Sequence, residues 1–94
     1  MNLTAEFLVG LGFIEDGYTN LSYDYYLNNE DFSIFVNLRS TCDKRAEILV
    51  FNKDKNNKKE VSIKESRESY VKHLEFTVDD LRGAIKLSGI DFEV

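Results

Sequence analysis

The sequence contains no proline and a single cysteine, and each shortage excludes a class of structure. Without proline, the chain has neither a polyproline ligand nor a proline-rich linker. Because Cys42 is the lone cysteine, an intramolecular disulfide and a metal cluster held by cysteines are both excluded. A lone thiol without a disulfide framework is typical of a reducing compartment, so we expect a cytoplasmic protein.

Histidine is equally scarce, and His73 is the only one. Cys42 and His73, oriented by Asp79 or Asp80, have the residue types of cysteine catalysis, but no flanking signature supports such a pair. A structural zinc site needs more nitrogen and sulfur ligands than one histidine and one cysteine supply. Glycine-rich phosphate-binding loops and EF-hand calcium loops are also missing. We therefore expect no enzyme, no cofactor and no metal.

The chain has no long apolar run. The longest spans residues 7–14, and Gly10 and Gly12 interrupt it. A membrane-spanning helix requires about 20 apolar residues in succession. Glu6 precedes this run at the place where a secretory signal carries basic residues, so we expect neither a membrane span nor a signal peptide.

Lysine and arginine are absent from residues 1–38, and the charges of the chain fall into blocks. An acidic start is followed by a basic middle at residues 39–72 and an acidic end at residues 73–94. In total, 17 acids and 12 bases give a net charge of −5 at pH 7. This balance disfavours ordinary nucleic-acid binders and anionic membrane surfaces as partners, since both are recognised by a basic face.

The residues that are present suffice for one folded domain. The chain has 94 residues, of which 43% are hydrophobic and 13% aromatic. This content argues against disorder, and the length matches a single small domain at residues 1–94.

Two segments carry the apolar periodicity of a helix. The first has a cap at Asn2 or Thr4 and a stop at Gly12, and its apolar stripe is Leu3, Phe7, Leu8 and Leu11. The second begins at Thr77, which forms a capping box with Asp80, and stops at Gly89. Its apolar stripe is Val78, Leu81, Ala84 and Ile85.

Four segments between these helices alternate apolar and polar residues with the period of a β-strand. They are residues 18–27, 32–38, 46–51 and 60–65, and they are separated by polar connections at residues 28–31, 39–45 and 52–59. Residues 70–76, which also fit a helical turn, or residues 90–94 at an edge supply a fifth strand. The prediction is an α+β fold: a four- to five-stranded antiparallel meander sheet with N-terminal and C-terminal helices packed on one face.

The predicted sheet has one unusual face. The helices should cover the face that carries Ile34, Val36, Ile48, Val50, Val61 and Ile63. The opposite face should then be polar, yet it carries Phe35, Leu49 and Phe51, with Tyr26 beside them. An exposed apolar patch of this kind is typical of an interaction surface. Two other arrangements remove the patch: residues 66–76 fold over it, or a one-residue shift in register exchanges the two faces.

Charged residues suggest two further partner types. The acidic, tyrosine-rich segment at residues 15–31 favours a basic protein surface, and Asp24, Glu30 and Asp31 are the predicted charged rim of the apolar patch. Alternatively, a nucleic acid could be bound by the lysine-rich loop, whose candidate residues are Lys53, Lys55, Lys58 and Lys59. Asp54 and Glu60 interrupt that loop, which is also the usual composition of a solvated hairpin tip.

These observations predict a small acidic protein-binding domain without catalytic activity. Its partner is another protein or a second copy of the chain, which makes a homodimer one of the expected states. Size and charge suit an inhibitor, an immunity protein or an accessory protein of a mobile element, by analogy alone. The high asparagine and lysine content suggests a bacterial or phage genome that is rich in A and T. The alternative is a nucleic-acid-associated accessory protein that uses the lysine-rich loop.

Overall fold

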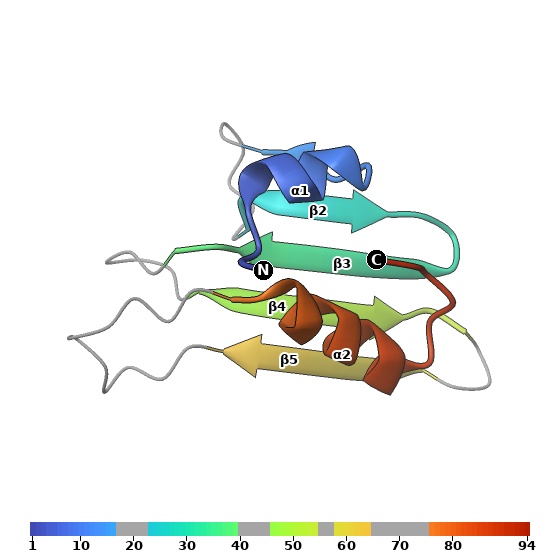
Figure 1. Cartoon of the computed structure of the whole chain (residues 1–94). Helices are drawn as coiled ribbons and strands as arrows, with labels where there is room; N and C mark the ends of the chain where they lie inside the picture. Colours follow the sequence, from blue (N-terminus) through green and yellow to red (C-terminus); the bar gives the residue numbers. More distant parts are fainter. Residues whose placement is uncertain (17–22, 40–45, 55–57, 65–75) are drawn as a thin grey trace.

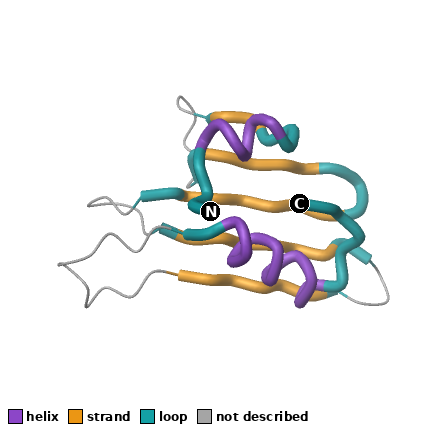
Figure 2. Tube along the Cα trace, viewed as in Figure 1, coloured by secondary structure: helices purple, strands orange, loops and turns teal. Residues whose placement is uncertain are grey.

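The computed structural model describes residues 1–16, 23–39, 46–54, 58–64 and 76–94. It has two layers: a five-stranded antiparallel sheet, and a second layer of two helices with the C-terminal segment between them (Figures 1 and 2). In chain order the elements are α1 (Ala5–Gly10), β1 (Ile14–Glu15), β2 (Tyr25–Asn28), β3 (Phe32–Asn37), β4 (Glu47–Asn52), β5 (Lys59–Lys64) and α2 (Val78–Ser88).

The sheet is a meander in which each strand pairs with the next one along the chain, in the order β1-β2-β3-β4-β5. This confirms the predicted α+β class and the predicted antiparallel meander. The fifth strand is β1, a segment for which the sequence predicted no strand. The predicted edge strand at residues 90–94 is wrong, because that segment is irregular in structure. Residues 70–75 lie outside the described part of the chain.

The core lies between the sheet and the helices. Even-numbered residues of β3 and β4 point into it, and the four fully buried ones are Ile34, Val36, Ile48 and Val50. The helices contribute Leu8 from α1 and Leu81 from α2, which are also fully buried. Val61 and Ile63 of β5 pack against this cluster while remaining half-buried. The predicted assignment of faces is therefore confirmed for β3, β4 and β5.

Both helices end as their sequences predict. After α1, the N–H of Gly12 donates to the carbonyl of Val9 and the N–H of Phe13 to that of Leu8, both at 3.0 Å. Gly12 has φ +103°, which favours glycine, and buried Phe13 folds back on the helix in a Schellman arrangement. In α2, Thr77 and Asp80 form the expected capping box, and Gly89 ends the helix with φ +77°.

The two chain ends hold the helical layer together. Leu3 donates its N–H to the carbonyl of Phe76 at 2.7 Å, and Val78 donates to that of Met1 at 2.9 Å. After α2, the C-terminal segment turns back over the sheet between the helices (Figure 1). There the Phe92 ring packs edge-on against Phe32, with centroids 5.4 Å apart. The apolar alternation of residues 90–94 therefore serves packing onto the core.

Asn52 joins the end of β4 to the end of α2. Its side chain is only 6% exposed, although the sequence indicated an exposed loop from residue 52. The Nδ2 group donates to the carbonyl of Ser88 at 2.9 Å, and Oδ1 accepts from the N–H of Asp54 at 3.0 Å. A carbonyl at a helix end lacks an intrahelical partner, so this buried amide satisfies a group that would otherwise be unpaired. Lys59 also belongs to β5 rather than to the predicted loop.

Neighbouring residues of β4 provide a matched test of the two faces. Ile48 is fully buried under the helices, whereas Leu49 points to the opposite face and is half-buried. We expect Ile48→Ala to lower the free energy of unfolding by about 2–5 kcal/mol, because it leaves a cavity in the core. Leu49→Ala removes atoms that are partly exposed and should cost clearly less.

Urea unfolding followed by circular dichroism measures both values. Equal losses in the two variants would mean that the face of Leu49 is packed as tightly as the helix-covered face, and would contradict the assignment of Ile48 and Leu49 to a covered and a more open face.

Candidate functional site

The sheet face turned away from the helices, called the outer face below, carries a row of side chains across all five strands. Strand pairing places Ile14 beside Tyr26, Tyr26 beside Phe35, Phe35 beside Leu49, and Leu49 beside Ser62. Directly paired residues share a face in an antiparallel sheet. The outer face thus holds an apolar row of four residues that ends in a serine at β5.

A second, more polar row runs beside the first. It consists of Asn28, Ser33, Phe51 and Glu60. The prediction that Tyr26, Phe35, Leu49 and Phe51 share one face is confirmed by this register. All four are half-buried, and Ile14 is 54% exposed. Ile14 could not be recognised from the sequence, since a two-residue strand has too short an alternation.

Tyr23 also belongs to the outer face, whereas an unbroken alternation over residues 18–27 would place it on the face opposite Tyr26. Its ring packs against Phe35 with centroids 5.2 Å apart. The chain bends at Asp24, just before β2 begins, and the backbone N–H of that residue donates to Oδ1 of Asn37 at 2.8 Å. This bend interrupts the alternation that the sequence extended back to residue 18.

Glu47 is the polar centre of this face. Its carboxylate accepts hydrogen bonds from the Tyr23 hydroxyl and the Ser62 hydroxyl, both at 2.6 Å. The Lys64 ammonium lies 3.8 Å from the same carboxylate. Three strand regions are therefore connected through one side chain, which the sequence analysis did not single out.

The surroundings of Tyr23 shift its acidity. Burial raises the pKa of the Tyr23 phenol well above its ordinary value, and the hydrogen bond to Glu47 and the negative charges of Glu47 and Glu60 raise it further. Burial also raises the pKa of Tyr25, with smaller contributions from Glu15 and Asp24. Both shifts mean that the folded protein keeps these phenols protonated at pH values where an unfolded chain begins to lose the protons.

The predicted acidic rim is divided between two places. Asp24 lies just before β2, whereas Glu30 and Asp31 lie in the turn that follows the strand. Since these positions are at opposite ends of β2, the three carboxylates do not form one cluster. The role of Asp24, Glu30 and Asp31 as a charged rim stays a prediction, with the acids at both ends of β2.

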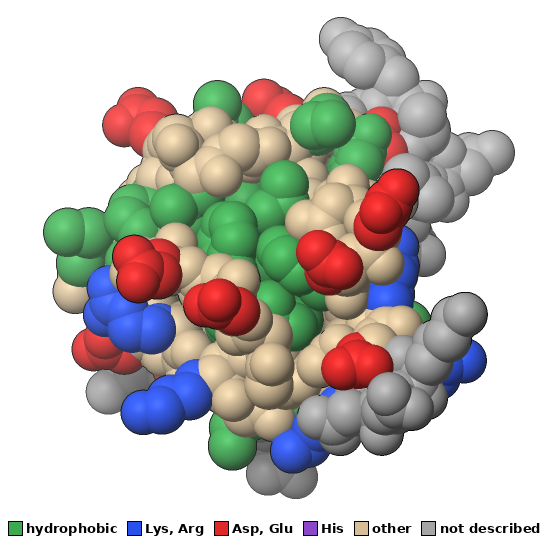
Figure 3. All heavy atoms as spheres, turned by 90° about the vertical axis from the view of Figure 1, so that its right-hand side faces the viewer, with side chains coloured by type: hydrophobic (Ala, Val, Ile, Leu, Met, Phe, Trp, Pro, Cys, Tyr) green, Lys and Arg blue, Asp and Glu red, His purple; other side chains and the backbone are tan. Residues whose placement is uncertain are grey.

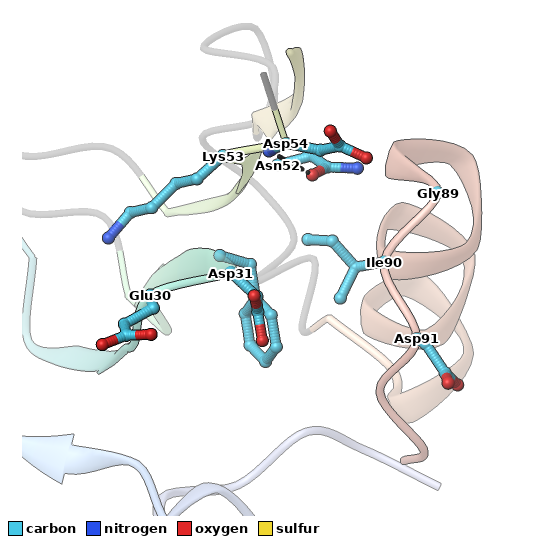
Figure 4. A pocket seen from close by; sticks show the side chains of 9 residues that line it. Glu30, Asp31, Asn52, Lys53, Asp54, Gly89, Ile90 and Asp91 are labelled. Atoms are coloured by element: carbon cyan, nitrogen blue, oxygen red, sulfur yellow. Dashed lines mark hydrogen bonds between the residues drawn. The ribbon is translucent and has the colours of Figure 1, made fainter. Parts of the chain in front are cut away.

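Glu30 and Asp31 instead line a cavity of about 430 Å³ at one end of the molecule (Figure 4). Phe32 and Ile90 supply apolar walls, and the remaining lining residues are Asn52, Lys53, Asp54, Gly89 and Asp91. At this end, hydrophobic side chains gather at the centre with acidic side chains around them (Figure 3). Among the described residues, no three acidic, cysteine or histidine side chains are grouped so that they could hold a metal ion.

The structure describes three of the four lysine candidates. The Lys53 ammonium donates to Oδ1 of Asn28 at 2.6 Å and to the carbonyl of Asn29 at 2.7 Å, so it fastens the β2–β3 turn. Lys58 and Lys59 are exposed at the start of β5. Lys55 lies outside the described residues, as do Cys42 and His73. No helix in the described part of the chain is long and apolar enough to cross a membrane.

Comparison of the chain with protein-family models, with curated proteins and with solved structures finds no match to any of them. The function therefore has to be argued from the residues of this chain.

The raised pKa of Tyr23 predicts a loss of stability in alkali. An ordinary tyrosine ionises at a pH of about 10. Below that pH the protonated phenol contributes its full stabilisation. Above it the unfolded chain loses the proton first, so the free energy of unfolding falls as the pH rises. We expect Tyr23→Phe to be less stable than the wild type at neutral pH, because the bond to Glu47 is lost, and to lose less stability on going to alkali.

Thermal unfolding across a series of alkaline pH values tests this expectation. Tyr25 contributes in the same direction, so a Tyr23→Phe, Tyr25→Phe double variant should have a still flatter profile. An unchanged alkaline slope in Tyr23→Phe would contradict the role given to the Tyr23–Glu47 bond.

Proposed function

We propose that this domain acts by binding another protein through the outer face of its sheet, without catalysing a reaction. One observation carries the proposal: Ile14, Tyr26, Phe35 and Leu49 form a continuous apolar row. Both helices cover the other face of the sheet (Figure 1). Aromatic and aliphatic side chains in such a row are favoured anchors in protein interfaces, because they bury a large area at low cost in conformational entropy.

Polar groups around the row suit the same role. Glu47 and Lys64 lie at one side of it, and Glu60 lies on the other side in the row of Phe51. A protein interface commonly has an apolar centre and a polar rim that remains hydrated. The chain's net charge of −5 favours a partner surface of opposite sign, since complementary charge accelerates encounter. Because a lone cysteine such as Cys42 is typical of a reducing compartment, we propose the cytoplasm as the place of this binding.

The alternative partner is a nucleic acid bound through Lys58 and Lys59. This binding would depend on contacts between the lysines and the phosphate backbone of the nucleic acid, and such contacts weaken steeply as the salt concentration rises. An apolar interface is much less sensitive to salt, so the salt dependence of binding separates the two proposals.

Affinity capture with tagged variants tests the proposal. We expect Phe51→Asp to abolish retention of the partner protein, because it removes an aromatic ring next to the apolar row and puts a carboxylate there beside Glu60. Val9→Asp is the matched control: Val9 is 52% exposed on α1, in the helical layer, so the same charge there should leave retention unchanged. The retained proteins are identified by mass spectrometry, with and without nuclease and at two salt concentrations.

Circular dichroism must show that both variants are folded. Equal retention by Phe51→Asp and the wild type would overturn the outer face as the binding site. Retention that disappears with nuclease, or in a Lys58→Glu, Lys59→Glu variant, would favour the nucleic-acid alternative.

A further inference from the structure

Strand β5 ends the sheet and leaves one of its edges without a partner among the described strands. Figure 1 shows it as the outermost strand, beyond β4. Its residues Lys59, Glu60, Ser62 and Lys64 are exposed, and Val61 and Ile63 are half-buried. An edge strand presents a row of backbone N–H and C=O groups that can pair with another strand.

The sequence of β5 is complementary to itself in the antiparallel direction. When two copies are aligned about a two-fold axis at Ser62, Glu60 of each copy faces Lys64 of the other, and Val61 faces Ile63. Glu60, Ser62 and Lys64 share the outer face, whereas Val61 and Ile63 share the helix side. The alignment thus pairs opposite charges on one face and apolar side chains on the other, each of them twice.

Other alignments lose this complementarity. In an antiparallel pair, the N–H and C=O groups of two facing residues either both point toward the neighbouring strand or both point away from it. When the two strands are copies of β5, this requires the two-fold axis to pass through a residue rather than between two residues. An axis at Val61 places Lys58 opposite Lys64, two like charges. An axis at Ile63 places Ser62 opposite Lys64, so neither Glu60 nor Lys64 faces an opposite charge in the other copy. Ser62 is therefore the favoured centre.

Helix α2 supplies a second, independent feature at the same edge. Leu87 is 62% exposed, the most exposed large apolar side chain of the helix. Arg82 marks the opposite flank, because its guanidinium donates to the carbonyl of Val94 in the segment that lies toward α1. Arg82 and Leu87 are five positions apart in the helix, which separates their side chains by about 140° around the helix axis. Leu87 therefore lies on the flank of α2 that faces the β5 edge.

The spacing between layers suits contact between two such helices. Helix α2 packs over both β4 and β5 (Figure 1). Because neighbouring strands lie about 4.8 Å apart, pairing of two β5 strands would place the two α2 axes roughly 10 Å from each other. Packed helices in proteins have axes about 8–10 Å apart. With the axis at Ser62, one Leu87 would lie at each end of this seam, because α2 ends beside Asn52 and its strand partner Lys59.

We propose that the chain forms a homodimer in which β5 pairs antiparallel with β5 of a second copy, about a two-fold axis at Ser62. The two sheets become one sheet of ten strands, with all helices on one side and both outer faces on the other. This inference does not rest on the proposed function, since the pairing uses the backbone edge of β5 whereas the apolar row lies on the outer face, although Glu60 and Lys64 border both.

Charge reversal in separate chains tests the pairing. E60K and K64E each replace both intermolecular ion pairs by like charges, so each variant alone should dimerise on the order of tenfold more weakly than the wild type. An equimolar mixture of the two should recover dimers, because the E60K chain meets the K64E chain with opposite charges at both places. Sedimentation equilibrium measures the mass, against 10.9 kDa for one chain.

K58E is the matched control for K64E. It also replaces a lysine by a glutamate, but outside the span between Glu60 and Lys64, so it should dimerise like the wild type. Circular dichroism confirms folding of each variant. A wild type that stays monomeric at the highest soluble concentration would overturn the proposal. So would a dimer that persists unchanged in both single variants.

Disulfide formation provides a second measurement that does not depend on charge. Facing residues of paired strands have Cα atoms about 4.5–5.5 Å apart, within the range that a disulfide spans. In a Cys42→Ser background, S62C should form covalent dimers on oxidation, seen on a non-reducing gel. E60C should not, because its two copies would lie roughly 14 Å apart along the strands. Equal cross-linking of S62C and E60C would exclude the axis at Ser62.

Discussion

Burial of one face of the sheet is the constraint on which the rest of the structure depends. Ile34, Val36, Ile48 and Val50 are completely covered by the helical layer, in which Leu8 and Leu81 are equally buried. Side chains alternate between faces along a strand, so this burial sends Phe35, Leu49 and Phe51 to the opposite side. Any shift in register by one residue would expose the core. The candidate interaction surface is therefore a direct consequence of how the core is made.

The strongly periodic elements could be predicted from the sequence, and the others could not. The alternation in β3 and β4, the Thr77–Asp80 capping box and the glycine stops all rest on local chemistry that a short window of sequence contains. Strand β1 is too short to show a period, and the bend at Asp24 interrupts the one in β2. Asn52 was expected in a loop because asparagine favours turns, whereas its burial depends on the distant carbonyl of Ser88.

The same distinction applies to the candidate site. That Tyr26, Phe35, Leu49 and Phe51 share a face follows from strand periodicity, and the structure confirms it. Charge counted along the chain does not show at which end of a strand a residue lies, so the separation of Asp24 from Glu30 and Asp31 by the length of β2 could not be predicted. Tyr23 and Glu47 were missed as a pair, since 24 positions separate them and only the sheet brings them together.

Pairing between the start of the chain and the segment that leads into α2 has a consequence for the order of folding. The sheet grows by hairpins between neighbouring strands, which need only short loops to close. The bridge between Asn2 and Thr77 joins residues 75 positions apart, so it closes a long loop and forms late. On a ribosome, the strands can pair before residues 76–78 have emerged. Helix α1 would complete its docking only after α2 has been synthesised, and the core would stay open on one side until then.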